Sequence, residues 1–125
     1  MSPAPAPSGP IVQIFGTPDS QPTRAALRFF KERRIEVHLV DINRKPMAAG
    51  ELRRFVECLG ARALADTESK AWRDAGLGYL SMSDADLSDR LLSDQRLLKI
   101  PLVRMNNEFA AGRDEPAWKS LVSSR

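Results

Sequence analysis

The sequence has very few of the side chains that cross-link chains or bind metals. It contains one cysteine, Cys58, and one histidine, His38. A single cysteine excludes an internal disulfide and is typical of a protein in a reducing compartment. We expect Cys58 to be a small buried or half-buried packing residue rather than a resolving or metal-binding thiol. Neither a metal site nor a bound cofactor is expected.

Long apolar runs are also missing. No run approaches the ~18 residues that a membrane-spanning helix needs. Residues 1–10 are rich in proline and alanine and have neither the charged start nor the apolar centre of a signal peptide, so a disordered or extended tail is expected. The sequence therefore predicts a cytoplasmic protein with no membrane partner, in which residues 11–122 form one domain.

Strong charge of one sign is lacking as well. The chain has 125 residues, 42% of them hydrophobic, and a formal net charge of +3. This length and composition are ordinary for one globular domain. So small a positive excess does not indicate nucleic-acid binding, and no direct nucleic-acid partner is expected.

The most informative stretch of the sequence is near its start. Residues 11–15 are mostly apolar with β-branched members, which predicts a strand buried on both faces. A loop follows, and a helix is predicted from about Gln21 to Arg34 with either Asp19 or Ser20 as its N-cap. A helix that begins at the carboxyl end of a strand presents free N–H groups and a positive dipole end. Such a place favours an anion or a thiolate.

This first helix is amphipathic. We expect Ala26, Leu27 and Phe30 to form its buried stripe. The opposite side carries four cations, which are Arg24, Arg28, Lys31 and Arg34. This basic group is open to two interpretations, a solvated helix face or a docking surface for an acidic partner.

The remaining pattern predicts a mixed α/β domain. A second strand over residues 36–41 follows the first helix and should be parallel to the first strand. A helical insert comes next, in which one helix ends at Gly60 and another begins at Ser83. The chain then returns to strands with a hairpin over residues 102–111, and a last helix starts near Pro116.

Several of these residues resemble the opening of the arsenate reductase family, which includes the Spx regulators and related thioredoxin-fold proteins. The matching residues are Phe15-Gly16 and Arg24-Ala25-Ala26-Leu27. Between them, Ser20 stands where that family has its nucleophilic cysteine. The resemblance covers about residues 11–122 and implies an α/β, thioredoxin-like fold with the order β-α-β, helical insertion, β-β-α.

The resemblance extends to a proline and to part of an arginine set. Pro101 lies where the family has a proline that is usually cis, so we predict a cis Ile100–Pro101 bond. Of the family's oxyanion-holding arginines, only Arg113 has a counterpart here; one position falls at or next to Asp66, and another is Ile100 with Lys99 beside it. The expected anion-binding residues are therefore Ser20, Arg24 and Arg113.

A serine in place of the cysteine removes the thiolate that would form a covalent arsenate or mixed-disulfide intermediate. Arsenate reduction by this chain is not expected, and our interpretation is a binding or regulatory module with a protein partner, for which the Spx resemblance suggests RNA polymerase. Two alternatives stay open. The chain is a glutathione- or thioredoxin-linked thiol oxidoreductase whose catalytic cysteine is substituted by serine in this sequence, or it binds a small anion through Ser20, the helix N-terminus and Arg24. The small-molecule partner expected in place of a protein is a small oxyanion or glutathione.

Overall fold

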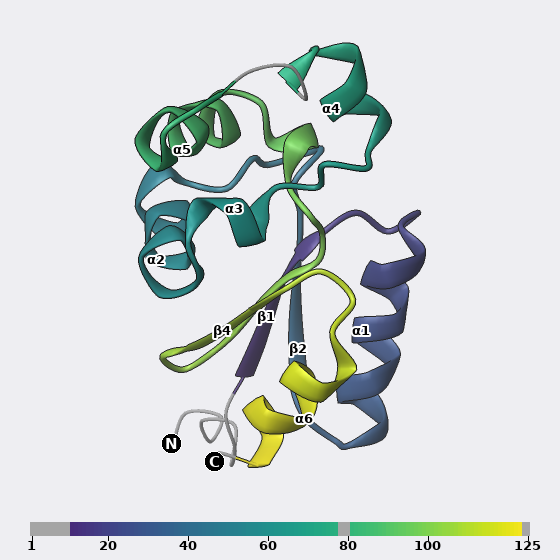
Figure 1. Cartoon of the computed structure of the whole chain (residues 1–125). Helices are drawn as coiled ribbons and strands as arrows, with labels where there is room; N and C mark the ends of the chain where they lie inside the picture. The colour runs from purple at the N-terminus through teal and green to yellow at the C-terminus, as the bar shows by residue number, and fades with distance from the viewer. Residues whose placement is uncertain (1–10, 78–80, 124–125) are drawn as a thin grey trace, which may run out of the picture.

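The computed structural model describes residues 11–77 and 81–123, and the tail predicted for residues 1–10 lies outside them. A four-stranded sheet in the order β2-β1-β3-β4 forms the centre of the protein (Figure 1). Its strands are β1 (Ile11–Gly16), β2 (Glu36–Asp41), β3 (Leu102–Met105) and β4 (Glu108–Ala111). β2 is parallel to β1, whereas β3 is antiparallel to both β1 and β4. This is the α/β, thioredoxin-like arrangement that the sequence predicts.

One face of the sheet is covered by the first and last helices, α1 (Gln21–Glu32) and α6 (Glu115–Ser123). Val12 and Ile14 of β1 point into this layer, where Phe29 and Phe30 of α1 pack against Trp118 of α6. Side chains alternate along a strand, so the next residues, Gln13 and Phe15, belong to the other face. Ile11 is 41% exposed, which corrects the expectation of a first strand buried on both faces throughout.

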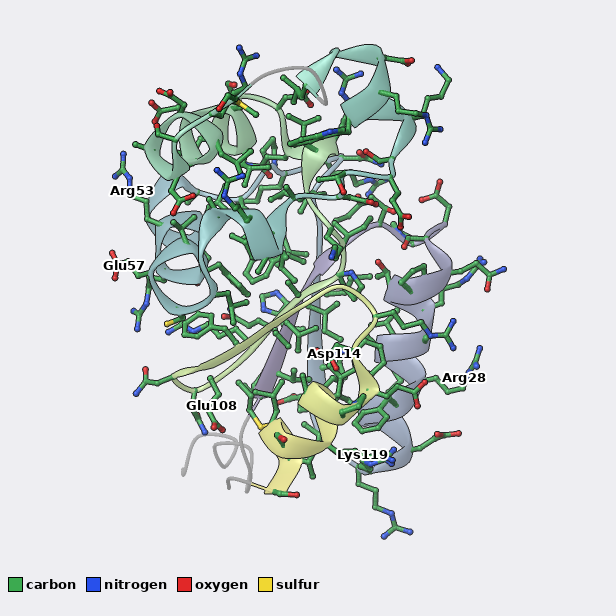
Figure 2. All side chains as sticks on the ribbon, viewed as in Figure 1. Arg28, Arg53, Glu57, Glu108, Asp114 and Lys119 are labelled. Carbon is green, nitrogen blue, oxygen red and sulfur yellow. The ribbon has the colours of Figure 1, made fainter. Side chains whose placement is uncertain are left out.

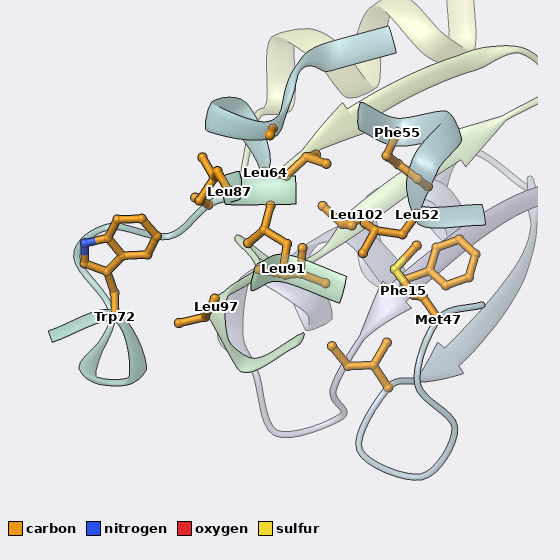
Figure 3. Close-up of a cluster of buried hydrophobic side chains, with 14 of the residues drawn as sticks. Phe15, Met47, Leu52, Phe55, Leu64, Trp72, Leu87, Leu91, Leu97 and Leu102 are labelled. Carbon is orange, nitrogen blue, oxygen red and sulfur yellow. The ribbon is translucent and has the colours of Figure 1, made fainter. Parts of the chain in front are cut away.

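The helical insertion covers the other face. Its elements are α2 (Ala49–Leu59), α3 (Ala61–Leu64), α4 (Lys70–Asp74), α5 (Asp84–Ser93) and the short 3₁₀ helix η2 (Gln95–Leu97). Their apolar side chains form a second core on Phe15 and Leu102 (Figure 3). Two predicted helix boundaries are correct. Gly60 follows the end of α2, and Ser83 precedes α5 and caps it with its hydroxyl.

The end of α1 differs from the prediction. The helix ends at Glu32, and Arg34 has a φ of 58°. The backbone N–H of Arg34 donates to the carbonyl of Lys31, and that of Ile35 donates to the carbonyl of Phe30, so the turn satisfies two late carbonyls of the helix. Glycine is the usual residue in such a turn, so an arginine there gives little signal in the sequence.

Two burial predictions need correction. Cys58 is exposed on α2, not a packing residue, because Leu52 and Phe55 supply the buried face of that helix. On α1, Ala26 and Phe30 are buried as expected, but Leu27 is only half-buried, and Thr23 and Phe29 are buried instead. No helix among the described residues is long and apolar enough to cross a membrane.

Candidate functional site

The candidate site is at the carboxyl end of β1, where three neighbouring segments meet. Gly16 closes β1 and pairs with Asp41 at the end of β2. On its other side, the pairing of Phe15 with Leu102 brings Pro101 beside the start of the loop. The backbone N–H of Gly112 donates to the carbonyl of Pro101 at 2.9 Å, which extends the row to the residue after β4. The β1–α1 loop, Pro101 and Gly112 therefore lie together at one end of the strands, along the edge of the sheet that the carboxyl end of β1 forms.

Ser20 is the N-cap of α1. Its Oγ accepts a hydrogen bond from the backbone N–H of Thr23 at 3.3 Å, and its own N–H donates to the carbonyl of Thr17 at 3.1 Å. Of the two caps left open by the sequence, the structure selects Ser20. The Ser20 hydroxyl thus stabilises the helix start by satisfying one of its free N–H groups.

Few backbone donors remain at this helix start. Pro22 has no N–H, and the N–H of Arg24 donates to the carbonyl of Ser20 at 3.0 Å. With Thr23 capped, Gln21 carries the one N–H of the first turn that has no partner among the described residues. An anion here would therefore meet the helix dipole and a single free amide rather than a cradle of N–H groups.

The other site residues predicted from the sequence lie along the same edge. The Ile100–Pro101 bond is cis, the isomer that the resemblance predicts, and Pro101 is buried. Arg113 follows Gly112 and is exposed; its guanidinium is 3.9 Å from the carboxylate of Glu115, an ion pair within its own loop. The aliphatic part of Lys99 covers Gly112, so this lysine lies beside Arg113.

Asp66 has a structural role in this region. Its N–H donates to the carbonyl of Leu97 at 2.8 Å, and its carboxylate accepts from the N–H of Glu68 at 3.2 Å. The carboxylate thus fixes the turn that precedes α4, where the family resemblance implies an arginine. The structure gives Asp66 no contact with Ser20, Arg24 or Arg113.

A cavity of about 380 Å³ opens next to the loop and was not predicted from the sequence. Thr17 and Ile100 belong to its wall, and so do residues of the segments 42–46 and 92–98. Gln95 holds the two segments together, because its Oε1 accepts from the N–H of Met47 at 2.8 Å and its Nε2 donates to the Met47 carbonyl at 2.9 Å. These partners are 48 positions apart in the chain, which hides the contact from any local pattern.

One ion pair gives this cavity its charge. Arg96 donates from Nε and Nη2 to the two carboxylate oxygens of Asp94, at 2.9 and 2.8 Å. These hydrogen bonds lower the pKa of the Asp94 carboxyl below its ordinary value, and the same carboxylate raises the pKa of Arg96. Because the guanidinium is already paired, the cavity wall presents little net positive charge to an anion.

The Ser20 hydroxyl donates no hydrogen bond to a histidine or a carboxylate among the described residues, Asp19 of its own loop included. The chain's one histidine, His38, pairs in register with Gln13 and lies on the face of the sheet opposite α1. The one cysteine, Cys58, is on α2, which also covers that opposite face. Among residues 11–77 and 81–123, no group of histidine, cysteine and acidic side chains is arranged to bind a metal ion.

Comparison with known proteins shows the family to which the chain belongs. The model of the ArsC family matches residues 15–121. The chain belongs to the ArsC family. A relative named "Uncharacterized protein YfgD", from Escherichia coli strain K12, is 27% identical over 105 residues, which is 82% of this chain and 88% of the relative.

Solved structures agree in fold. An arsenate reductase from Vibrio cholerae superimposes with a TM-score of 0.77 at 22% identity, covering 90% of this chain and 98% of that one. An arsenate reductase related protein from Brucella melitensis gives a TM-score of 0.66 at 16% identity, with 94% and 97% covered. At these identities the likeness establishes the fold, and the chemistry depends on the residues at the loop.

Proposed function

We propose that this ArsC-family protein works by binding a partner and not by thiol redox chemistry. The observation that carries the proposal is the hydrogen bond from the Thr23 N–H to the Ser20 Oγ. It makes the residue at the family's nucleophile position a helix cap. A serine hydroxyl becomes a nucleophile when an adjacent base takes its proton, and among the described residues the Ser20 hydroxyl donates no hydrogen bond to a histidine or a carboxylate.

The chain's one thiol does not replace the missing nucleophile. Cys58 is exposed on α2, on the face of the sheet opposite α1, whereas Ser20 lies in the loop that leads into α1. A mixed disulfide with glutathione or thioredoxin at the loop needs a sulfur atom there, and Ser20 supplies an oxygen. We therefore expect no arsenate reduction through the family's covalent route in this sequence.

A protein partner suits the surface better than a small oxyanion does. The start of α1 keeps one free N–H, and Arg113 and Arg96 are both paired with carboxylates. By contrast, Arg24, Arg28 and Lys31 of α1 form no ion pair with any described residue. RNA polymerase is the example of a partner that the Spx resemblance suggests, whereas a small oxyanion or glutathione remains the ligand to test at the loop.

A second candidate is a thiol oxidoreductase of the same family in which serine replaces the catalytic cysteine. The cavity beside Thr17 and Ile100 favours it, since a pocket of about 380 Å³ next to the loop leaves space for a reductant or substrate. This candidate requires that the scaffold still activates a thiol once one is present.

The two candidates separate in one assay. Arsenate reduction would be followed by NADPH oxidation in the presence of either glutathione with glutaredoxin and glutathione reductase or thioredoxin with its reductase. We expect no turnover above the protein-free rate for this sequence. Turnover by this sequence would refute the binding proposal, whereas turnover by the Ser20→Cys variant alone would show that the scaffold keeps the capacity for redox catalysis.

A further inference from the structure

The outer surface of α1 carries a line of cations. Arg24, Arg28 and Lys31 are exposed and are spaced by four and three residues, which places them on one side of the helix. At 1.5 Å per residue, the line is ~10 Å long. We call these three residues the basic face of α1.

The basic face has no counter-charge of its own. None of the ion pairs among residues 11–77 and 81–123 includes Arg24, Arg28 or Lys31. Glu32 is the one acidic residue of α1, and it lies four positions after Arg28 without forming an ion pair with it. Like charges at these spacings repel one another along a helix.

The first turn of α1 adds no negative charge beside these cations. It contains no acidic residue, and Arg24 lies near the positive end of the helix dipole. The first turns of α2, α5 and α6 each contain aspartate or glutamate, the arrangement that the dipole favours, whereas those of the short helices α3 and α4 contain none. Arg24 therefore lies near the positive end of the dipole with no carboxylate in its own helical turn.

The positive surface extends onto α6. Trp118 packs against Phe29 and Phe30, which holds α6 beside α1. The next residue, Lys119, is exposed and, like Arg28, projects outward from its helix (Figure 2). A partner lying along α1 would meet Arg28 and Lys119 together.

We propose that the basic face of α1 is a docking surface for an acidic helical segment of a partner protein. This proposal rests on the proposed function, because it names the surface and the chemistry of the partner. Carboxylates spaced by three and four residues on a helix repeat at the spacing of Arg24, Arg28 and Lys31. Such a segment supplies the counter-charge that α1 lacks and is attracted over long range by the unpaired cations.

Two other anionic partners fit this surface less well. A helix that lies on a membrane inserts apolar side chains beside its cations, but Ala26, Phe29 and Phe30 of α1 are buried in the core. Single-stranded nucleic acids are held by aromatic side chains on which bases stack, and the described aromatic residues of α1 and α6 are all buried. Recognition at the basic face therefore depends on its charges, which extend over about two helical turns of α1.

The test uses the full chain and a synthetic alanine-based helical peptide with glutamates at positions i, i+4 and i+7. In an NMR titration we expect the first shifts at the amides of residues 24–31 and 119. The Arg28→Glu/Lys31→Glu variant should bind at least about tenfold more weakly, a loss of the size expected when close charge pairs are removed. It should gain affinity for the same peptide with lysines in place of the glutamates.

The matched control is Arg53→Glu/Arg90→Glu, which makes the same charge change on α2 and α5 and should bind the acidic peptide as the parent does. Neither arginine is in an ion pair with another residue that the structure describes, and Figure 2 shows Arg53 pointing away from α1. Because glutamates near the end of α1 could unfold the helix, circular dichroism is measured on every variant. An Arg28→Gln/Lys31→Gln variant repeats the test with neutral side chains.

Three results would overturn the proposal. These are shifts confined to other elements, an equal loss of binding in the control, and tighter binding at the basic face by an oligonucleotide or an anionic phospholipid vesicle than by the acidic peptide. Redox turnover by the unmodified chain would refute the proposed function but would leave a positive peptide titration intact. The absence of both turnover and peptide binding would refute this docking surface alone.

Discussion

Thr23 and Gly16 are in such close contact that a side chain at position 16 would collide with the threonine. A Cβ built on Gly16 would overlap Oγ1 of Thr23 and would be 2.9 Å from its Cγ2. The first turn of α1 therefore lies directly against the end of β1. Glycine is needed at position 16 for space, and this contact fixes where the loop places Ser20.

We expect Gly16→Ala to lower the free energy of unfolding by about 1–3 kcal/mol, the usual cost of adding atoms to a packed interior. Urea unfolding followed by tryptophan fluorescence would measure it. Gly50→Ala is the control, since no atom lies within 4 Å of a Cβ there; alanine in that helix should increase stability, by up to about 1 kcal/mol. In a Thr23→Ala background the cost of Gly16→Ala should shrink, and an undiminished cost would contradict the contact as its cause.

The order of the elements could be predicted from the sequence because it depends on local patterns. The hydrophobic period of residues 21–32, the serine before α5 and the asparagines of the hairpin each act within a few positions. The fold class, the hairpin and the last helix follow from such signals. The cap at Ser20 was one of two candidates, and the choice needed the loop geometry that the structure supplies.

The candidate site could be predicted only in part. Ser20 and Pro101 come to one edge because the strand register brings them there, and the resemblance located both residues. The cavity could not be predicted, because most of its wall comes from segments 42–46 and 92–98, which neither repeat nor carry a motif. The exposure of Cys58 was missed because position 58 borders the apolar stripe of α2. On a helix, a shift of one position along the sequence moves a side chain from the buried side to solvent.

Gln95 provides a direct test of how the cavity is held open. Replacing it with alanine removes both hydrogen bonds to Met47 and leaves two backbone groups of a half-buried loop without their partner. We expect a loss of about 1–3 kcal/mol in the free energy of unfolding, with faster hydrogen exchange at the Met47 amide. Gln21→Ala, at an exposed residue that has no side-chain hydrogen bond among the described residues, should change stability little. Equal effects of the two substitutions would contradict the role of Gln95.

The Asp94–Arg96 pair predicts a pH dependence of stability. Hydrogen bonds from Arg96 lower the pKa of Asp94 in the folded state, so the unfolded chain binds a proton more readily. The stabilisation is fully present above the unfolded pKa of about 3.9 and is lost as pH falls through the lower, folded pKa. The stability difference between the parent and Asp94→Asn should therefore be largest at neutral pH and narrow in acid. A difference that is constant with pH would show that the charge of Asp94 contributes nothing.

Ser20→Cys would test whether the loop still favours an anion. The sulfur would stand at the N-terminus of α1, near the free N–H of Gln21 and one turn from Arg24, and both favour the thiolate. Asp19, the neighbouring acid, opposes them, but its side chain is exposed and screened by solvent. The position is half-buried, so desolvation also opposes ionisation, though less than in a closed pocket.

We expect the lowering effects to dominate and the pKa of the introduced thiol to fall below the ~8.5 of a free cysteine, toward the ~3.5–7.5 range of thiolates at helix starts. Iodoacetamide alkylation against pH would measure it in a Cys58→Ala background, since the exposed Cys58 would otherwise react as well. Adding Arg24→Gln should raise the midpoint if the guanidinium contributes. A midpoint at or above that of a cysteine in a short unstructured peptide would mean that the loop keeps the family's shape without its electrostatics, and the second candidate function would then lose its physical basis.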